Sequence, residues 1–333
     1  MSLNLNPSYK TIWLLLGSLL ISACSGYLAT PISAVRYAEE GAMAADIATD
    51  AEFSVVSDVS NGVSVWYQGE KEARYNWSHQ GDGENLVTTV HIAADNNYVL
   101  TSDREAFALW DVASGEPMGF WRIDESSVRD VAVASSAAGI LVGRGNGKVL
   151  FFEPDSGRRI EFLGHQEKIN SVDISPNGRF ALTGGNDYVA YLWSTRSGQV
   201  IHRFSHPSRV TKVALDDKGR FAFTADSQKQ ARVWNVQTGE PISTLKFIER
   251  QKIFTDVEFS ADGKYLLTGS PSRGLSLWDL HSGEQIQEWR VTPREGASPR
   301  TAVVYGVSFL PDNRVLSVSS SGLAEVWEIN SEQ

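Results

Sequence analysis

The sequence predicts an all-β fold made of seven copies of one short unit. Strand-like runs that end in an aromatic residue recur at spacings of 41 to 49 residues, and a Ser-Gly or Thr-Gly turn follows five of them. A second turn, built from Asp, Asn, Lys and Gly, precedes the aromatic run in five units. Such residues supply the backbone geometry that hairpins need. The seven aromatic positions are Trp66, Trp110, Phe152, Trp193, Trp234, Trp278 and Trp327.

Each unit divides into four short strands joined by three turns. Apolar and polar residues alternate within the strands, as at 171–174 and 211–214. Four antiparallel strands repeated every 40 to 50 residues are typical of propeller blades. A single four-stranded sheet cannot bury both of its apolar faces, but sheets stacked around an axis can. We therefore predict a seven-bladed β-propeller of four-stranded antiparallel blades.

The two ends of the repeat region predict how the ring closes. The sequence stops six residues after Trp327, so the last blade lacks a fourth strand. Residues 31–38 form a strand-like segment ahead of the first blade and have no other place in the repeat. We predict that this segment forms the outer strand of blade seven, because closure of this kind removes an exposed sheet edge.

The fourth unit carries a specific resemblance. Its sequence contains Gly-His at 164–165, Ser-Pro-Asn-Gly at 175–178, Leu-Thr-Gly-Gly-Asn-Asp at 182–187 and Leu-Trp at 192–193, and so resembles a WD repeat of the β-propeller family. In that family a His, a Ser or Thr, an Asp and the Trp form a hydrogen-bonded tetrad that locks the blade. The matching residues here are His165, Thr183, Asp187 and Trp193.

The other units depart from this pattern. The fifth unit keeps His206, Thr224 and Trp234 but has Gln228 where the resemblance places the Asp. Most of the Gly-His pairs are missing elsewhere, and Phe152 replaces one Trp. We expect these departures to affect the rigidity of individual blades and not the fold.

The N-terminal segment is typical of an export signal. A polar stretch with one cation, Lys10, precedes an apolar run at 11–21 that is too short for a comfortable membrane span. Ile21-Ser22-Ala23-Cys24 then resembles the bacterial lipobox. That resemblance implies removal of residues 1–23, acylation of Cys24, a tether at 24–31 and a propeller at 32–333. Ser25, in place of Asp, implies sorting to the outer membrane of a Gram-negative bacterium. The alternative is a simple cleaved signal.

Composition and motifs exclude several functions. The formal net charge is −10, which argues against nucleic-acid binding, and the single Cys excludes a disulfide framework. The six His residues are scattered without metal-ligand spacing. Residues 143–148 resemble a phosphate-binding loop only superficially, because no helix follows them. We expect no catalytic residue, no metal and no cofactor.

The resemblance implies that two sets of loops share one face, here called the top face. Lead-in loops precede the first strand of each blade, and middle loops join its second and third strands. Together these loops contain 14 basic and 12 acidic residues, although the whole chain is acidic. The longest is the lead-in loop at 290–303. We predict partner contacts at Arg104, Arg129, Arg144, Arg209, Lys229, Arg250, Arg273, Arg290, Arg294 and Arg300.

These observations predict a lipid-anchored, periplasm-facing protein that acts as a non-catalytic scaffold in a cell-envelope complex. A narrower version is assistance in outer-membrane protein assembly, by analogy with the eight-bladed propeller lipoprotein of the barrel-assembly machine. The main alternative is recognition of a glycan or an anionic envelope polymer by the basic face. A lesser alternative is an enzyme with a ligand in its central channel.

Overall fold

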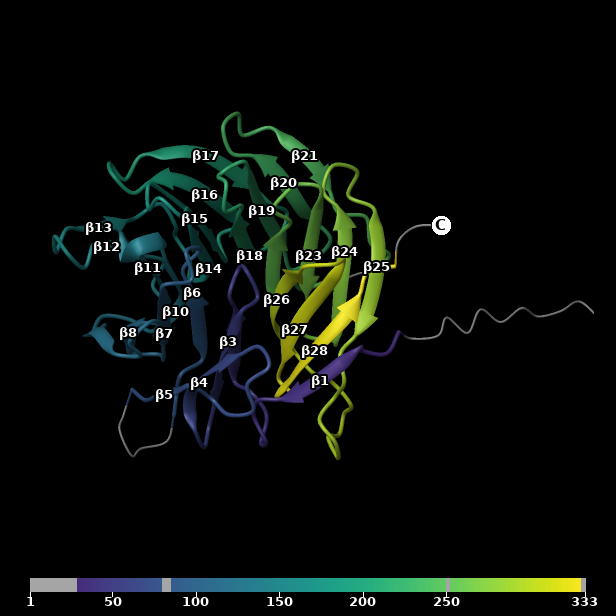
Figure 1. Cartoon of the computed structure of the whole chain (residues 1–333). Coiled ribbons are helices and arrows are strands. Elements are labelled where there is room, and N and C mark those ends of the chain that lie inside the picture. Colours follow the sequence, from purple (N-terminus) through teal and green to yellow (C-terminus); the bar gives the residue numbers. More distant parts are fainter. Residues whose placement is uncertain (1–28, 80–84, 250–251, 331–333) are drawn as a thin grey trace, which may run out of the picture.

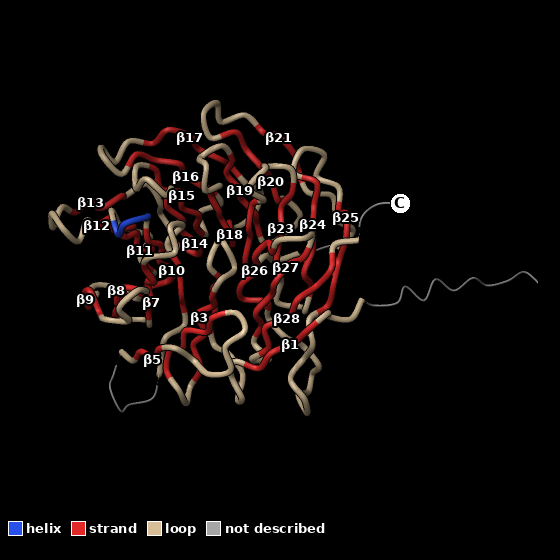
Figure 2. Tube along the Cα trace, in the orientation of Figure 1, coloured by secondary structure: helices blue, strands red, loops and turns tan. Residues whose placement is uncertain are grey.

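The computed structural model describes residues 29–79, 85–249 and 252–330. These residues form seven four-stranded antiparallel sheets arranged around a central axis (Figure 1). Strands dominate the described chain, and one short 3₁₀ helix, η1 (Ser135–Ala137), interrupts them (Figure 2). The predicted seven-bladed β-propeller is therefore confirmed. The predicted signal peptide and Cys24 lie outside the described residues.

The first four blades follow one another along the chain, each running from the central channel outward. Their strands are β2 (Ala44–Ile47), β3 (Phe53–Asp58), β4 (Gly62–Tyr67) and β5 (Tyr75–Trp77) in blade 1; β6 (Thr89–Ile92), β7 (Tyr98–Ser102), β8 (Ala106–Asp111) and β9 (Pro117–Arg122) in blade 2; β10 (Val128–Val133), β11 (Ile140–Arg144), β12 (Val149–Phe152) and β13 (Arg159–Phe162) in blade 3; and β14 (Ile169–Ile174), β15 (Phe180–Gly185), β16 (Val189–Ser194) and β17 (Val200–Ser205) in blade 4.

Two further blades repeat this order, and the last combines both ends of the chain. Their strands are β18 (Val210–Leu215), β19 (Phe221–Asp226), β20 (Ala231–Asn235) and β21 (Pro241–Thr244) in blade 5; β22 (Asp256–Phe259), β23 (Tyr265–Gly269), β24 (Gly274–Asp279) and β25 (Gln285–Arg290) in blade 6; and β26 (Val304–Leu310), β27 (Arg314–Ser319), β28 (Leu323–Glu328) and β1 (Ser33–Arg36) in blade 7.

The ring closes through β1, which pairs antiparallel with β28 and places Ser33 opposite Val326 (Figure 1). The Ile32 N–H extends the pairing by donating to the Val326 carbonyl at 2.7 Å. The predicted closure by an N-terminal strand is confirmed. Within the described part of the chain, no helix is long and apolar enough to cross a membrane.

Apolar clusters between neighbouring blades hold the sheets face to face. The cluster between blades 1 and 2 stacks Trp77 on Trp110, with ring centroids 4.9 Å apart. At the closing junction, Tyr37 stacks on Trp66 of blade 1 at 4.8 Å, immediately after β1. The closure therefore stacks an aromatic pair of its own as well as pairing strands.

Side chains on the innermost strands also cross every boundary between blades. The first strand of each blade is an edge strand, so its outer backbone groups need partners. Aspartates on four of these strands accept a hydrogen bond from a backbone N–H of the next blade. Three of these are Asp46 from Ile92 at 2.7 Å, Asp130 from Val172 at 2.9 Å and Asp173 from Leu215 at 2.6 Å.

The remaining four boundaries use related contacts. The Val133 N–H donates to His91 Nδ1 at 3.3 Å, and the Val307 N–H donates to Asp256 at 2.9 Å. Lys212 of blade 5 pairs with Asp256 of blade 6 at 3.5 Å. Ser308 of blade 7 donates to the Ala48 carbonyl of blade 1 at 3.3 Å. We call these seven contacts the channel clasps.

The closing aromatic pair yields a stability prediction. Tyr37 is 6% exposed, so Tyr37→Ala removes a buried ring from the junction of blades 7 and 1. We expect the free energy of unfolding, measured in urea, to fall by about 3 kcal/mol. Tyr265→Ala, at a position 37% exposed, is the control and should cost less than about 1 kcal/mol. Equal losses in the two variants would contradict this account of the closure.

Candidate functional site

The lead-in and middle loops meet at one face through backbone hydrogen bonds. The Val128 N–H donates to the Arg104 carbonyl at 2.8 Å, which joins the lead-in loop of blade 3 to the middle loop of blade 2. The Ser227 N–H donates to the Arg209 carbonyl at 3.0 Å, which joins the corresponding loops of blade 5. The long lead-in loop at 290–303 follows β25 and is the yellow-green loop below it in Figure 1.

Beneath the top face of blade 4, three predicted tetrad residues are in contact. His165 lies 2.9 Å from the Thr183 hydroxyl through Nε2 and 3.0 Å from Asp187 through Nδ1. The prediction that Trp193 joins them by a hydrogen bond is wrong. Its buried indole N–H has no hydrogen-bond partner among the described residues. The ring is held instead by parallel stacking on Phe162, with centroids 4.5 Å apart.

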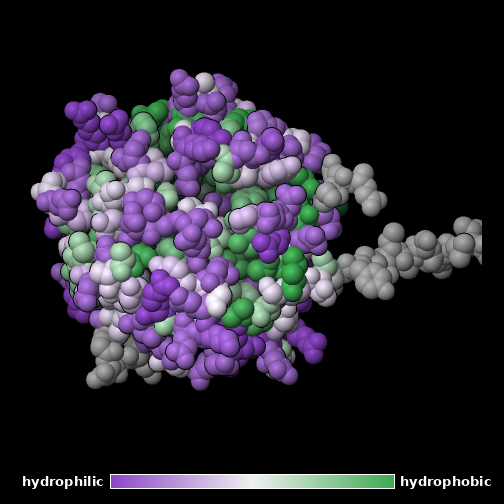
Figure 3. All heavy atoms as spheres, in the orientation of Figure 1, coloured by the Kyte–Doolittle hydropathy of each residue, from purple (hydrophilic) through white to green (hydrophobic). Residues whose placement is uncertain are grey.

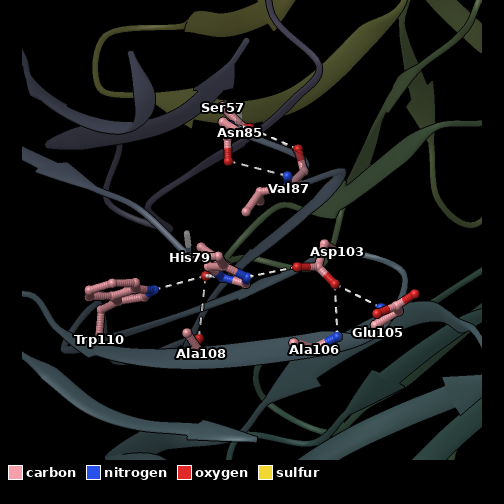
Figure 4. Close-up of polar contacts among 10 residues, drawn as sticks. Ser57, His79, Asn85, Val87, Asp103, Glu105, Ala106, Ala108 and Trp110 are labelled. Carbon is pink, nitrogen blue, oxygen red and sulfur yellow. Dashed lines mark hydrogen bonds and ion pairs between the residues drawn. The ribbon is translucent and has the colours of Figure 1, made fainter. Parts of the chain in front are cut away.

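Blade 2 contains a complete tetrad that sequence reasoning missed (Figure 4). His79 contacts the Thr101 hydroxyl at 2.7 Å and Asp103 at 3.2 Å, and the Trp110 indole donates to Thr101 at 2.8 Å. The acid follows its Thr by two residues here, whereas in blade 4 it follows by four. That shorter spacing hid the set from the sequence comparison.

Blade 5 uses the same short spacing, which corrects the interpretation of Gln228. His206 contacts the Thr224 hydroxyl at 2.9 Å and Asp226 at 3.4 Å, and Trp234 donates to Thr224 at 2.8 Å. Asp226 therefore supplies the carboxylate, and Gln228 is exposed. Burial lowers the pKa of His206, and likewise of His79, so both rings remain neutral at neutral pH.

Several carboxylates of the top face point inward and are used by the fold. Asp58, 2% exposed, accepts hydrogen bonds from the Ser60 and Asn61 N–H groups. Asp103 and Asp226, 9% and 1% exposed, likewise accept from N–H groups of their own loops in addition to contacting His. Among the described residues, none of these three acids forms an ion pair with a Lys or Arg of the top face.

Most of the predicted contact cations remain outside. Six of them are exposed and make no ion pair with any described residue: Arg104, Arg129, Arg209, Lys229, Arg290 and Arg300. The exposed Arg294 donates to the Glu40 carbonyl at 2.5 Å, which ties the long loop to the segment after β1. Arg273 is half-buried and donates to the Val291 carbonyl at 2.7 Å. Arg250 lies outside the described residues.

Arg144 is an exception, and its predicted role as a surface contact is wrong. The residue is 4% exposed, at the end of β11. Its guanidinium pairs with Glu161 and, at 3.4 Å, with Glu125. The two carboxylates come from neighbouring strands and loops, so the burial of Arg144 could not be seen in its own segment.

Exposed apolar side chains also lie on the loops of the top face, and the sequence analysis did not single them out. Val59, Leu86, Leu163 and Tyr188 are between 49% and 66% exposed. The signal available in the sequence was a large apolar residue inside a turn. Apolar side chains among unpaired arginines match the composition of protein-binding surfaces.

Comparison with known proteins identifies the repeat. The family model described as "WD domain, G-beta repeat" matches residues 157–194, 198–235 and 239–279. The chain carries WD40 repeats. In this WD40 propeller the matched residues cover the outer part of blade 3 through the third strand of blade 6.

Three relatives of the WD40 propeller illustrate how far the similarity extends. Pre-mRNA-processing factor 19 of Oryza sativa is 26% identical over 256 residues, which cover 73% of this chain and 48% of that protein. WD repeat-containing protein 1 of Rattus norvegicus is 23% identical over 254 residues, 73% of this chain and 34% of that protein. Polyadenylation factor subunit 2 of Cryptococcus neoformans is 26% identical over 123 residues, which cover 36% of this chain and 17% of that protein. The chain spans less than half the length of each relative.

The central channel of the WD40 propeller contains a cavity of about 270 Å³. Asp46, His91, Asp173, Lys212 and Glu258 are among its lining residues. Most of these side chains already take part in the channel clasps. Among the described residues, no group of three His, Cys, Asp or Glu side chains is arranged to hold a metal ion.

Carboxylates crowd this channel, and their titration reflects it. Burial, together with the charge of Asp256, raises the pKa of Asp46 to about 6, although His91 opposes the shift. Burial also raises the pKa of Glu258 well above its ordinary value, with nearby carboxylates adding to the effect. Burial and mutual repulsion therefore disfavour the ionised carboxylates in the channel, including Asp46 of the clasps.

The tetrad correction predicts unequal effects of two neighbouring substitutions. Asp226→Ala leaves His206 and two loop N–H groups without their buried partner, so the free energy of unfolding should fall by about 2–3 kcal/mol. Gln228→Ala changes an exposed side chain and should cost no more than about 0.5 kcal/mol. Urea unfolding followed by Trp fluorescence measures both. A larger loss from Gln228→Ala would restore the original interpretation.

Asp46 predicts a specific pH dependence. With a folded-state pKa near 6 and an unfolded value near 4, the folded protein binds more protons between these values, so the contribution of Asp46 to stability falls as pH rises. Asp46→Asn cannot titrate. Its stability deficit relative to the original protein should be about 2 kcal/mol larger at pH 4.5 than at pH 7.5. A deficit that grows toward pH 7.5 would refute the prediction.

Proposed function

We propose that this WD40 propeller is a non-catalytic protein-interaction scaffold, anchored by lipid at Cys24 to the periplasmic side of a bacterial outer membrane. It would act through its top face within a cell-envelope complex. The matched WD repeats, together with the similarity to WD repeat-containing protein 1, support a protein-interaction scaffold as the general role. The membrane anchor, the periplasmic location and the envelope complex are proposed from the lipobox resemblance at residues 21–24.

The observation that carries the proposal is the exposure of unpaired cations on the top face. Asp58, Asp103 and Asp226 are buried in hydrogen bonds, whereas six Arg and Lys side chains are exposed and unpaired. Exposed apolar residues on the same loops supply area for a desolvated contact. A partner with acidic side chains would be steered to this face although the whole chain is negatively charged.

The chain's N-terminal path supports the anchor. Eight residues, 24–31, separate Cys24 from the start of the propeller, so at ~3.4 Å per residue the tether reaches less than about 30 Å. The tether leads to β1 at the rim of blade 7, where Ile32 and Val35 are 54% and 47% exposed. Figure 3 shows hydrophilic residues over most of this side, with apolar residues near the point where the N-terminal segment leaves.

The unpaired cations also favour a second candidate, an anionic glycan or polymer of the envelope. The two candidates differ in their response to salt. Polymer binding through phosphate or carboxylate groups weakens steeply as ionic strength rises, whereas a protein interface with an apolar centre is less sensitive. The enzyme alternative has less support, because most of the acidic and basic side chains that line the channel take part in the clasps.

Affinity purification from gently solubilised envelope tests the proposal. The original protein should retain a stoichiometric protein partner at moderate salt, and an Arg290→Glu, Arg300→Glu double variant should retain about tenfold less. Arg179→Glu with Arg196→Glu, both exposed on turns at the opposite end of the blades, is the matched control and should bind normally. If the original protein and both variants all lose their bound material at moderate salt, the result would favour the polymer.

The anchor is tested separately by cell fractionation. Cys24→Ala removes the thiol that the lipobox resemblance assigns to acylation, so the protein should move from the membrane fraction to the soluble fraction. Lys10→Ala, which leaves the Cys in place, is the control. Continued membrane association of Cys24→Ala after washing in high salt would refute lipid anchoring.

A further inference from the structure

Tyr188 has a backbone conformation that a bulky residue rarely adopts. It lies in the middle loop of blade 4, directly before β16, with φ = 68°. The equivalent positions in blades 3 and 7 are Gly147 and Gly322, with φ of 83° and 78°. Glycine adopts this left-handed region freely, whereas Tyr does so at an energetic cost. The sequence therefore places an aromatic residue where sibling blades use Gly.

No hydrogen bond or aromatic contact of the side chain explains this choice. The Tyr188 side chain is 53% exposed, and among the described residues it makes no hydrogen bond and no aromatic contact. Arg273, at the equivalent position of blade 6, also has positive φ, but its guanidinium holds the Val291 carbonyl of the long loop. The Tyr188 side chain makes no such hydrogen bond to a described residue. Strain retained at an exposed residue points to a role outside the fold.

The surroundings of Tyr188 define the kind of partner. The His206 N–H donates to the Tyr188 carbonyl at 2.9 Å, so the lead-in loop of blade 5, which carries Arg209, lies against it. On the other side, the Asn186 N–H donates to the Lys168 carbonyl at 2.9 Å. The Ser227 N–H donates to the Arg209 carbonyl, so the middle loop of blade 5, which carries Lys229, lies beside the lead-in loop of that blade. The loop of Tyr188 thus adjoins loops that carry three exposed cations.

Few acids oppose these cations locally. On loops 164–168, 186–188, 206–209 and 226–230, Glu167 is the one exposed carboxylate among the described residues. Asp187 contacts His165, and Asp226 contacts His206. Leu163, 66% exposed, lies two residues before His165 and adds apolar surface. The patch is cationic with an apolar centre.

We propose that Tyr188 is the aromatic anchor for an acidic protein segment that binds across blades 4 and 5. This inference rests on the proposed function, since it names a site and a partner chemistry on the same face. The ring supplies desolvated area at the centre, and Lys168, Arg209 and Lys229 pair with the partner's carboxylates at the rim. The strain at Tyr188 is compensated when the ring is covered.

Selection of random peptides displayed on phage against the immobilised protein tests the inference without a known partner. Enriched peptides should be rich in Asp and Glu and should contain apolar residues. Tyr188→Asn removes the ring but keeps a residue that tolerates positive φ. The variant should bind those peptides about tenfold more weakly, with an unchanged or higher melting temperature. Tyr265→Asn, away from the top face, is the control.

Three outcomes would overturn the inference: enriched peptides without excess acid, undiminished binding by Tyr188→Asn, or a lowered melting temperature in that variant, which would reveal a structural role. The proposed function fails in a different experiment. If the envelope yields no protein partner while acidic peptides still require Tyr188, the envelope scaffold is wrong and the site stands. If an envelope partner binds Tyr188→Asn normally, the site is wrong and the scaffold stands.

Discussion

The ring depends on the channel clasps that cross each boundary between blades. The first strand of every blade is a sheet edge that faces the channel, and its outer N–H groups would otherwise be left to water. Asp46, Asp130 and Asp173 satisfy some of them from the preceding blade. Packing between blades is apolar and therefore non-directional, whereas these hydrogen bonds fix the register of one sheet against the next. Their cost is a channel crowded with carboxylates, visible in the raised pKa of Asp46.

A second use of carboxylates shapes the top face. Three middle loops turn sharply between two strands, and Asp58, Asp103 and Asp226 accept hydrogen bonds from N–H groups of these turns. These acids are buried, whereas Arg104 and Lys229 on two of the same loops are exposed and make no ion pair with a described residue. Burial of the three acids therefore adds to the small excess of basic residues in the top-face loops, although the chain as a whole carries a net charge of −10.

The closure of the ring links the proposed anchor to the proposed binding face. Strand β1 completes blade 7, and Tyr37, directly after it, packs against blade 1, so the segment that follows the proposed tether spans the junction of the first and last blades. Arg294 of the long lead-in loop contacts the Glu40 carbonyl just after β1. The longest loop of the top face is thus fastened to the same segment that leads from Cys24. A partner bound on that loop would be held at a short distance from the membrane.

The sequence by itself determined the seven blades, their four-stranded composition and the closure by residues 31–38, because strand alternation and turn residues are local and repeat seven times. It also located the loops of the top face. Only the tertiary structure decided which side chains are available there. Arg144 is buried by carboxylates from other segments, Trp193 lacks the expected hydrogen bond, and Asp226 replaces Gln228 in its tetrad. The channel clasps and the strained Tyr188 were likewise invisible, because each contact joins residues that lie on different strands or blades, and a backbone angle leaves no mark on the periodicity of a single strand.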